Sequence, residues 1–113
     1  MKAAAFEYHR PDTLAEALDL AASLDNAKFL AGGQSLVAML NMRYAIVDNL
    51  IDINRIPDLD GLTLTDDELR VGAMTRQKML KADADIARRA PIFAAALDFV
   101  GHLQTRSRGT IGG

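Results

Sequence analysis

The feature that most constrains this chain is a pair of adjacent glycines that separates an expected strand from an expected helix. The stretch around the glycines reads Phe29-Leu30-Ala31-Gly32-Gly33-Gln34-Ser35-Leu36. Residues 27–31 are predicted to form the strand, and Ser35 is a natural N-cap for the helix. A second strand, predicted over residues 50–53 and expected to be partly buried, follows the helix. A strand, a helix and a strand in this order predict a right-handed crossover between parallel strands.

The double glycine gives this loop the properties of an anion site. Glycine lets the backbone adopt positive φ and approach a ligand closely, and the helix that follows supplies unpaired N–H groups and a partial positive charge. These properties favour a phosphate as the ligand. A tight strand-to-helix turn without any ligand accounts for the same residues, and from this stretch alone it is the simpler interpretation.

Length and composition predict a single cytoplasmic unit over residues 1–113. The chain has 113 residues, 50% of them hydrophobic, and a net charge of −2, so one core is expected. No apolar run approaches the ~20 residues that span a bilayer, and Glu7 comes too early for a signal peptide, so no integral membrane segment is expected. Without cysteine, the chain has no disulfide, no thiol nucleophile and no iron–sulfur cluster of its own. The near-neutral charge predicts no nucleic-acid partner.

Residue spacing predicts an extended segment and a helix before the glycine stretch. The extended segment lies near residues 4–8 and stops at Pro11. Thr13 and Glu16 have the spacing of a capping box, which begins a helix. The apolar face of this helix is predicted to carry Leu14, Ala17, Leu18, Ala21 and Leu24.

Turn residues organise the second half of the chain. Residues 62–65 and 69–71 are predicted to pair as a hairpin across an acidic turn. The helices expected after the hairpin are a short one capped by Thr75, one over residues 85–90, and one that starts at Pro91 and stops at Gly101. Residues 102–113 show no helical period.

The residues that commonly carry catalysis or bind metals have no suitable arrangement here. The glycine stretch lacks the third glycine of a Rossmann loop and the lysine of a nucleoside-triphosphatase loop. His9 and His102 have no metal-ligating partner at helical spacing, and the acidic stretch at residues 66–68 is expected to be a solvated turn. Four methionines are expected to fill the core: Met39, Met42, Met74 and Met79. No catalytic residue and no metal site is therefore predicted.

A second double glycine, Gly112-Gly113, follows Thr110 near the C-terminal end of the chain. Two glycine loops that converge from different strands are suited to hold the two adjacent phosphates of a dinucleotide with neutral N–H donors. A flexible terminus is the alternative explanation of this second pair. Arg106 and Arg108 lie just before it and are either near such a diphosphate, against a partner subunit, or exposed to solvent.

Several segments carry a family resemblance. The segments are Ala31-Gly32-Gly33-Gln34-Ser35-Leu36, Gly101-His102-Leu103-Gln104-Thr105-Arg106 and Arg108-Gly109-Thr110-Ile111-Gly112-Gly113, with similarity also around residues 6–11, 51–56 and 71–75. With these segments the whole chain resembles the FAD-binding medium subunit of the molybdenum hydroxylases, in particular that of aerobic carbon monoxide dehydrogenase and its xanthine and nicotine dehydrogenase relatives. Ser107 departs from the asparagine expected between the two arginines.

The resemblance implies an α+β fold and an FAD site. The fold is expected to be the N-terminal half of a vanillyl-alcohol-oxidase-type FAD-binding domain, with a small parallel β-α-β unit, flanking helices and a hairpin, and with the remainder of the domain absent. The residues implied to bind the FAD diphosphate are Leu30, Ala31, Gly32, Gly33, Gln34, Ser35, Leu36, Gly109, Thr110, Ile111, Gly112 and Gly113. FAD carries the electrons, so no residue of this chain needs to act as an acid or base.

The resemblance also implies partners for an oxidoreductase complex. These are an iron–sulfur small subunit and a molybdopterin large subunit, in a heterotrimer that pairs as a dimer of heterotrimers. Electrons are expected to pass from the iron–sulfur clusters through FAD to an external acceptor. Two alternatives stay open: a phosphate- or nucleotide-binding module for a different ligand, and a structural assembly fragment that binds no ligand. The sequence identifies neither the substrate nor the final acceptor.

Overall fold

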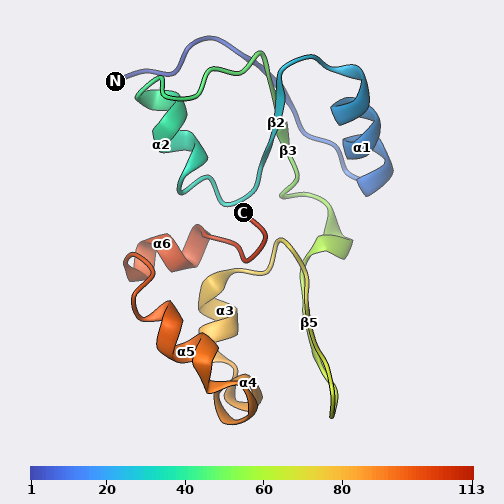
Figure 1. The fold of residues 1–113 in the computed structure, drawn as a ribbon. Helices are drawn as coiled ribbons and strands as arrows, with labels where there is room; N and C mark the ends of the chain where they lie inside the picture. Colours follow the sequence, from blue (N-terminus) through green and yellow to red (C-terminus); the bar gives the residue numbers. More distant parts are fainter. The chain divides into compact units, whose positions relative to one another are not determined.

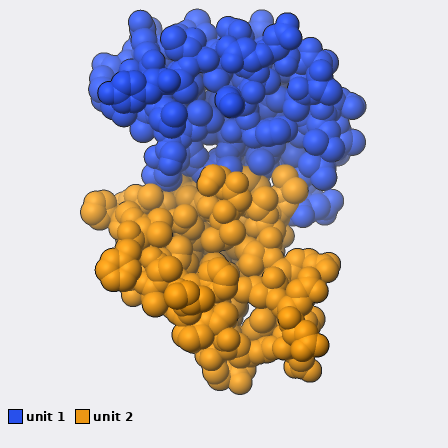
Figure 2. All heavy atoms as spheres, in the orientation of Figure 1, with its two compact units in different colours: residues 1–58 blue, residues 59–113 orange.

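The computed structural model describes residues 1–113, which divide into two compact units. Unit 1 comprises Met1–Asp58 and unit 2 comprises Leu59–Gly113 (Figure 2). The composition predicts a single unit, whereas contacts within the chain cluster separately on the two sides of residue 58.

Unit 1 is built on a three-stranded parallel sheet. Its strands are β1 (Glu7–His9), β2 (Ala27–Leu30) and β3 (Asn49–Asp52), in the order β1-β3-β2. Asn49 of β3 lies opposite Glu7 on one side and Ala27 on the other. The predicted parallel crossover is confirmed, but the partial burial expected for the second strand is wrong. All of β3 is buried, because a central parallel strand is covered along both edges and both faces.

Two helices flank this sheet. They are α1 (Leu14–Ser23) and α2 (Leu36–Asn41). The chain passes from β1 across to β2 and then back to β3, so right-handed crossovers place the two helices on opposite faces, as Figure 1 shows. The core on the α2 side is a cluster of Leu40, Val47 and Leu50. The predicted β-α-β unit therefore accounts for α2 and its core.

The start of α1 is fixed by side-chain capping. Thr13 Oγ1 accepts a hydrogen bond from Glu16 N at 3.2 Å, while Glu16 Oε2 accepts one from Asp12 N at 3.0 Å. The bond from Glu16 N to the Thr13 side chain confirms the capping prediction. In a capping box the Glu16 side chain would accept from Thr13 N, but here it accepts from Asp12 N, one residue earlier. Arg55, which follows β3, pairs with Asp12 through Nε and Oδ1 at 3.1 Å. The predicted apolar face is only partly buried, since Leu18 stays 55% exposed.

Unit 2 joins a hairpin to four short helices. The hairpin strands are β4 (Leu62–Leu64) and β5 (Leu69–Val71), which follow the 3-10 turn η1 (Pro57–Leu59). The strands pair antiparallel, with Leu62 opposite Val71, and the acidic turn is exposed. The helices are α3 (Gln77–Ala82), α4 (Ala84–Arg89), α5 (Pro91–Leu97) and α6 (Leu103–Arg108). The predicted hairpin and the predicted start of α5 at Pro91 are confirmed.

The core of unit 2 lies between the hairpin and the helices. Leu80, Ile86 and Leu97 from three helices form its buried centre, and the apolar side chains of both strands pack against them. Alternation along each strand turns Thr63 and Arg70 outward and the leucines inward. Figure 1 shows the hairpin beside this helical cluster. The same alternation was the signal that predicted the hairpin.

Three further expectations for the helices and the core are wrong. Residues 103–108 form α6, although this segment lacks an apolar period; a helix this short depends on tertiary contacts, and α6 contacts α3. Thr75 does not cap α3: its hydroxyl is fully buried and pairs with the backbone of Gly61, donating to O and accepting from N at 3.0 Å each. Of the four methionines, only Met74 is buried. No helix is long and apolar enough to cross a membrane.

Candidate functional site

The first glycine loop leaves the carboxyl end of β2 beside the central strand. Gly33 has a φ of +75°, and a Cβ built on it would lie 3.0 Å from Val37 Cγ2 and 3.4 Å from Leu30 Cδ1. An L-residue is strained at this φ and has little room for a side chain. Open parallel sheets bind ligands outside the carboxyl ends of their strands. The loop thus lies where the fold class places a ligand.

The loop presents backbone N–H groups that have no partner within the protein. The amides of residues 31–36 donate no intramolecular hydrogen bond, whereas Gly33 O accepts from Val37 N at 3.1 Å. The first helical turn therefore begins at Gly33. Ser35 occupies the predicted N-cap position of α2, but it has αR dihedral angles and its side chain makes no cap bond. Free donors at the start of a helix form a region of positive potential.

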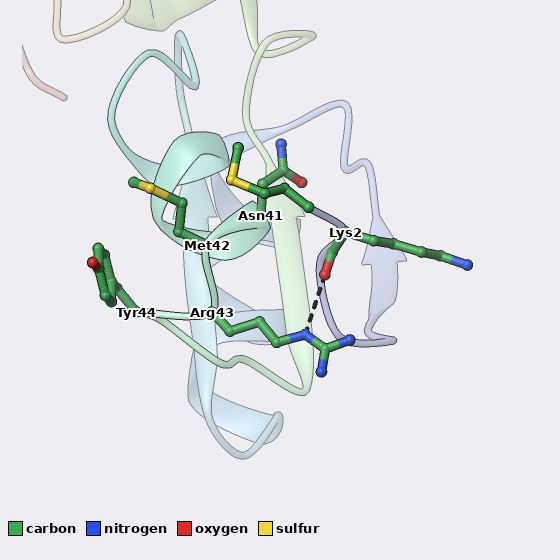
Figure 3. A pocket seen from close by; sticks show the side chains of 6 residues that line it. Lys2, Asn41, Met42, Arg43 and Tyr44 are labelled. Carbon is green, nitrogen blue, oxygen red and sulfur yellow. Dashed lines mark hydrogen bonds between the residues drawn. The ribbon is translucent and has the colours of Figure 1, made fainter.

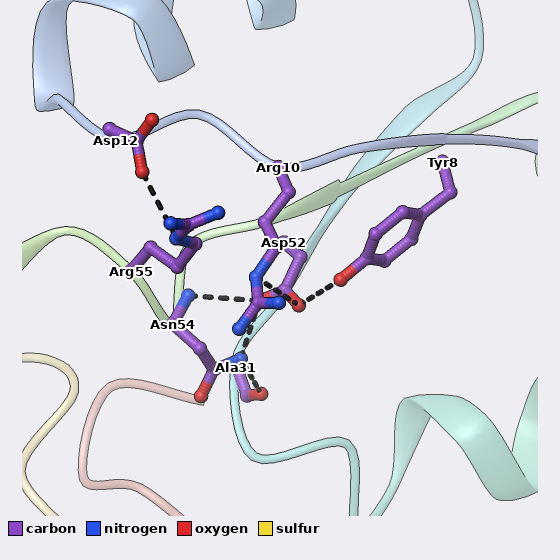
Figure 4. A network of polar contacts seen from close by, with 7 residues as sticks. All are labelled: Tyr8, Arg10, Asp12, Ala31, Asp52, Asn54 and Arg55. Atoms are coloured by element: carbon purple, nitrogen blue, oxygen red, sulfur yellow. Dashed lines mark hydrogen bonds and ion pairs between the residues drawn. The ribbon is translucent and has the colours of Figure 1, made fainter.

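A polar network fixes the start of this loop from the neighbouring strand (Figure 4). Asp52, the last residue of β3, accepts hydrogen bonds from Asn54 N at 2.9 Å and from Asn54 Nδ2 at 2.6 Å through Oδ1. Its other oxygen accepts from Tyr8 Oη and lies 3.8 Å from Arg10 Nε. Asn54 Nδ2 also donates to Ala31 O at 2.8 Å. Directly and through Asn54, the carboxylate of Asp52 therefore links β1, β3 and the loop that follows β2.

The charge state of this carboxylate follows from its partners. Burial acts to raise the pKa of Asp52, but hydrogen bonds from Tyr8 and Asn54, together with the charge of Arg10, outweigh it and lower the pKa below its ordinary value. The same contact raises the pKa of Tyr8, chiefly because its hydroxyl donates to Asp52. Asp52 is therefore ionised and Tyr8 is neutral at pH 7.

The second glycine loop is paired with a neighbouring segment of unit 2. Gln77 N donates to Gly109 O at 2.9 Å, Ile111 N to Thr75 O at 3.0 Å, and Gly112 N to Ala73 O at 2.9 Å. A Cβ on Gly112 would lie 2.7 Å from Ala73 Cβ and 2.9 Å from Ala73 O. Close approach of two backbones, rather than positive φ, requires glycine at this position.

Thr110, in the same loop, carries a buried hydroxyl without a partner. Its residue is 4% exposed, and Oγ1 makes no hydrogen bond. The backbone of Thr110 bridges Arg76 in antiparallel fashion. A buried hydroxyl that lacks a partner costs free energy. The atom is consequently a candidate for a contact with a ligand.

The two arginines before this loop have different environments. Arg106 Nη1 donates to the carbonyls of Leu97, Val100 and Gly101 at 3.3 to 3.4 Å, so its guanidinium satisfies the C-terminal end of α5. Arg108 is exposed. Ser107 Oγ donates to Leu103 O at 2.8 Å within α6. The local structure gives Arg106 a capping role that the sequence did not indicate.

The two predicted site segments lie in different units. Residues 30–36 belong to unit 1 and residues 109–113 to unit 2. The sequence missed Asp52 and Asn54 as residues that act on the first loop. The Asp-x-Asn spacing at the end of a strand was the available signal, because an Asp side chain commonly accepts from the N–H two residues later.

A second surface feature of unit 1 lies away from the loop network. It is an open depression lined by Met1, Lys2, Asn41, Met42, Arg43 and Tyr44 (Figure 3). Arg43 has a φ of +58° and donates from Nε to Lys2 O at 3.2 Å. No group of three or more His, Cys, Asp or Glu side chains is arranged to hold a metal ion. The glycine loops thus remain the candidate site.

A family model described as the FAD binding domain in molybdopterin dehydrogenase matches residues 4–113. The chain belongs to this family. This membership confirms the predicted family resemblance, and it confirms FAD as the cofactor of the family. The family also confirms the α+β architecture, with its parallel sheet and hairpin.

Curated relatives and solved structures agree with the family. The chain is 43% identical to the carbon monoxide dehydrogenase medium chain of Hydrogenophaga pseudoflava, over 96% of this chain and 38% of that one. It is 42% identical to 6-hydroxypseudooxynicotine dehydrogenase complex subunit alpha of Paenarthrobacter nicotinovorans, over 100% and 38%. A structure of carbon monoxide dehydrogenase from H. pseudoflava that lacks the Mo-pyranopterin moiety aligns with a TM-score of 0.93 at 41% identity, over 100% and 40%. The chain spans about two fifths of the length of these family members.

Proposed function

We propose that this chain binds FAD within the medium subunit of a molybdenum hydroxylase. The observation that carries the proposal is the run of unpartnered N–H groups over residues 31–36, at the carboxyl edge of a parallel sheet in a member of an FAD-binding family. The residues fit a diphosphate, because Gly33 leaves no room for a Cβ and keeps the backbone open to an anion. Neutral donors, rather than a lysine or arginine, hold the phosphates.

The residues that would hold FAD come from both glycine loops. The first loop, residues 30–36, supplies its free amides to the diphosphate, and the second loop, residues 109–113, supplies Thr110 Oγ1 and the amides that pairing leaves free. Hydrogen bonds from neutral groups to an anion are charge-assisted and short. FAD supplies the electron-transfer chemistry when it is bound, and the role of this chain is to bind and orient it. No side chain here is assigned a proton transfer.

The complex proposed for this chain has two further subunits. An iron–sulfur small subunit delivers electrons, and a molybdopterin large subunit oxidises the substrate, in a dimer of heterotrimers. Support comes from relatives that are named as medium chains or complex subunits. One relative is named as a carbon monoxide dehydrogenase chain and another as a 6-hydroxypseudooxynicotine dehydrogenase subunit. Because these two names refer to different substrates, family membership alone does not define a substrate. The final acceptor is external to the chain.

Titration of the intact apoprotein with FAD tests the proposal. We expect saturable binding with one FAD per chain, together with a flavin absorbance spectrum that remains after gel filtration. ADP, which carries the diphosphate without the flavin, should compete for the same site. Binding of another nucleotide in preference to FAD, or no nucleotide binding at all, would contradict the proposal.

A further inference from the structure

The side chain of Asn54 joins a strand end to the first glycine loop. Its Nδ2 donates to Asp52 Oδ1 at 2.6 Å and to Ala31 O at 2.8 Å, and its backbone N donates to the same Asp52 oxygen at 2.9 Å. From this geometry we propose that Asn54, held by Asp52, is a positioning residue that aims the Gly32 N–H at the diphosphate. The inference rests on the proposed FAD function.

The planarity of the peptide bond carries the argument from Ala31 to Gly32. The carbonyl of Ala31 and the N–H of Gly32 belong to one trans peptide unit, and no cis peptide occurs in the chain. In a trans peptide these two groups point in opposite directions across one rigid plane. A hydrogen bond that holds the Ala31 oxygen toward Asn54 therefore turns the Gly32 N–H away from Asn54.

The anchor for Asn54 is rigid enough to define that direction. Asp52 is 7% exposed and ends the central strand, where it pairs in parallel register with Leu30. Ile53 N donates to Leu30 O at 3.1 Å, just before the loop begins. Tyr8 Oη occupies the second carboxylate oxygen. A carboxylate fixed on two sides restricts the rotamers of the amide that contacts it, so the peptide of Ala31 and Gly32 is pre-oriented before a ligand arrives.

The orienting role differs from a general contribution to stability. Asn26 offers a matched comparison at the other end of β2, since its Nδ2 also bridges a carboxylate and a carbonyl, at 3.1 Å to Asp48 Oδ2 and 3.3 Å to Ile46 O. Asn26 has a φ of +45°, which alanine tolerates less well than asparagine. The Asn26→Ala variant should therefore lose at least as much stability as Asn54→Ala without touching the glycine loop.

Calorimetric titration with FAD, below the melting temperature of each variant, tests the inference on the intact protein. Asn54→Ala should weaken FAD binding by roughly tenfold to a hundredfold, the range set by losing a well-aimed donor to a charged group. At saturating FAD, the ³¹P resonances of the bound diphosphate should shift in Asn54→Ala. Asn26→Ala should keep both the affinity and the resonances of the unaltered protein. Equal losses in the two variants, or no loss in Asn54→Ala, would overturn the inference.

An exchange of the two residues separates the link to Ala31 from the link between positions 52 and 54. The double variant Asp52→Asn/Asn54→Asp retains an amide–carboxylate pair, but an ionised carboxylate at position 54 has no donor for the Ala31 carbonyl. Its FAD affinity should fall as far as that of Asn54→Ala, and full affinity in this variant would refute the orienting role. If the unaltered protein bound no FAD, the proposed function would fail, and this inference with it.

Discussion

The two glycine loops of this chain have similar sequences but different hydrogen bonding. In the first loop, residues 31–36 donate no backbone hydrogen bond within the protein, and the side chain of Asn54 holds the loop at one carbonyl. In the second loop, the amides of Gly109, Ile111 and Gly112 are all used by neighbouring backbone. The first loop therefore has donors available for a ligand, while the second is largely a structural pairing.

The glycines in the two loops are also required for different reasons. Gly33 needs positive φ, whereas Gly112 needs the absence of a Cβ against Ala73. A substitution of Gly33 should therefore act mainly on ligand affinity, and a substitution of Gly112 mainly on the stability of unit 2.

The largest effect is expected for Gly33→Val in the intact protein. A β-branched residue at a φ of +75° is strained, and its Cβ lies 3.0 Å from Val37 Cγ2, so FAD binding should weaken by at least about a hundredfold. Gly61→Val is the control, because Gly61 also has positive φ, at +142°, but open space around it. Retention of stoichiometric flavin by Gly33→Val, measured by absorbance, would show that the first loop does not hold the diphosphate.

Gly112→Ala should destabilise unit 2 rather than act primarily on the ligand. A Cβ placed 2.7 Å from Ala73 Cβ forces the two backbones apart, at a cost of about 2 kcal/mol of unfolding free energy. Hydrogen exchange of the amides of Ile111 and Gly112 measures this local stability. Unchanged protection of both amides would mean that the close approach to Ala73 is not important.

The two buried threonines of unit 2 should respond oppositely to replacement by valine. Thr75→Val removes a hydroxyl with two partners on Gly61 and should lower the unfolding free energy by about 1–3 kcal/mol. Thr110→Val removes a hydroxyl without a partner, so the stability of the apoprotein should stay the same or rise. The FAD affinity of Thr110→Val should fall by about tenfold, because the variant loses one charge-assisted hydrogen bond to the diphosphate. Thermal unfolding and titration measure the two quantities, and equal destabilisation in both variants would contradict the contrast.

The smallest effect is a difference in acid stability between the units. The pKa of Asp52 is lowered in the folded state, so its contribution to stability is complete above the unfolded pKa, about 4, and is lost as pH falls through the folded pKa. In unit 2 the hydrogen bond from Lys81 and its charge lower the pKa of Asp98, but that pair is exposed and screened. In Asp52→Asn, the protection of unit 1 amides against hydrogen exchange should fall less steeply as the pH is lowered. In Asp98→Asn, the pH dependence of amide protection in unit 2 should change little. An unchanged acid profile in Asp52→Asn would contradict this assignment.

Local patterns predicted most of the elements. Alternation at residues 62–64 and 69–71 identified the hairpin, Thr13 and Glu16 identified the start of α1, and Pro91 identified the start of α5. These signals lie within a few residues of the structure they specify, because capping and turn formation are local interactions. Residues 103–108 had no such signal, and their helix was missed.

For the candidate site, the sequence by itself determined the glycine loops and the family. A double glycine after an apolar strand is a local feature, and the order of such segments along the chain identifies the family without coordinates.

Only the tertiary structure decided how these residues are used. The placement of β3 between β1 and β2 brings Asn54 to the carbonyl of Ala31, and the pairing of residues 109–112 with 73–77 occupies the second loop. Both depend on contacts between segments far apart in sequence. A hydrogen bond across such a separation depends on how the strands pair, and the residue types alone do not specify that pairing.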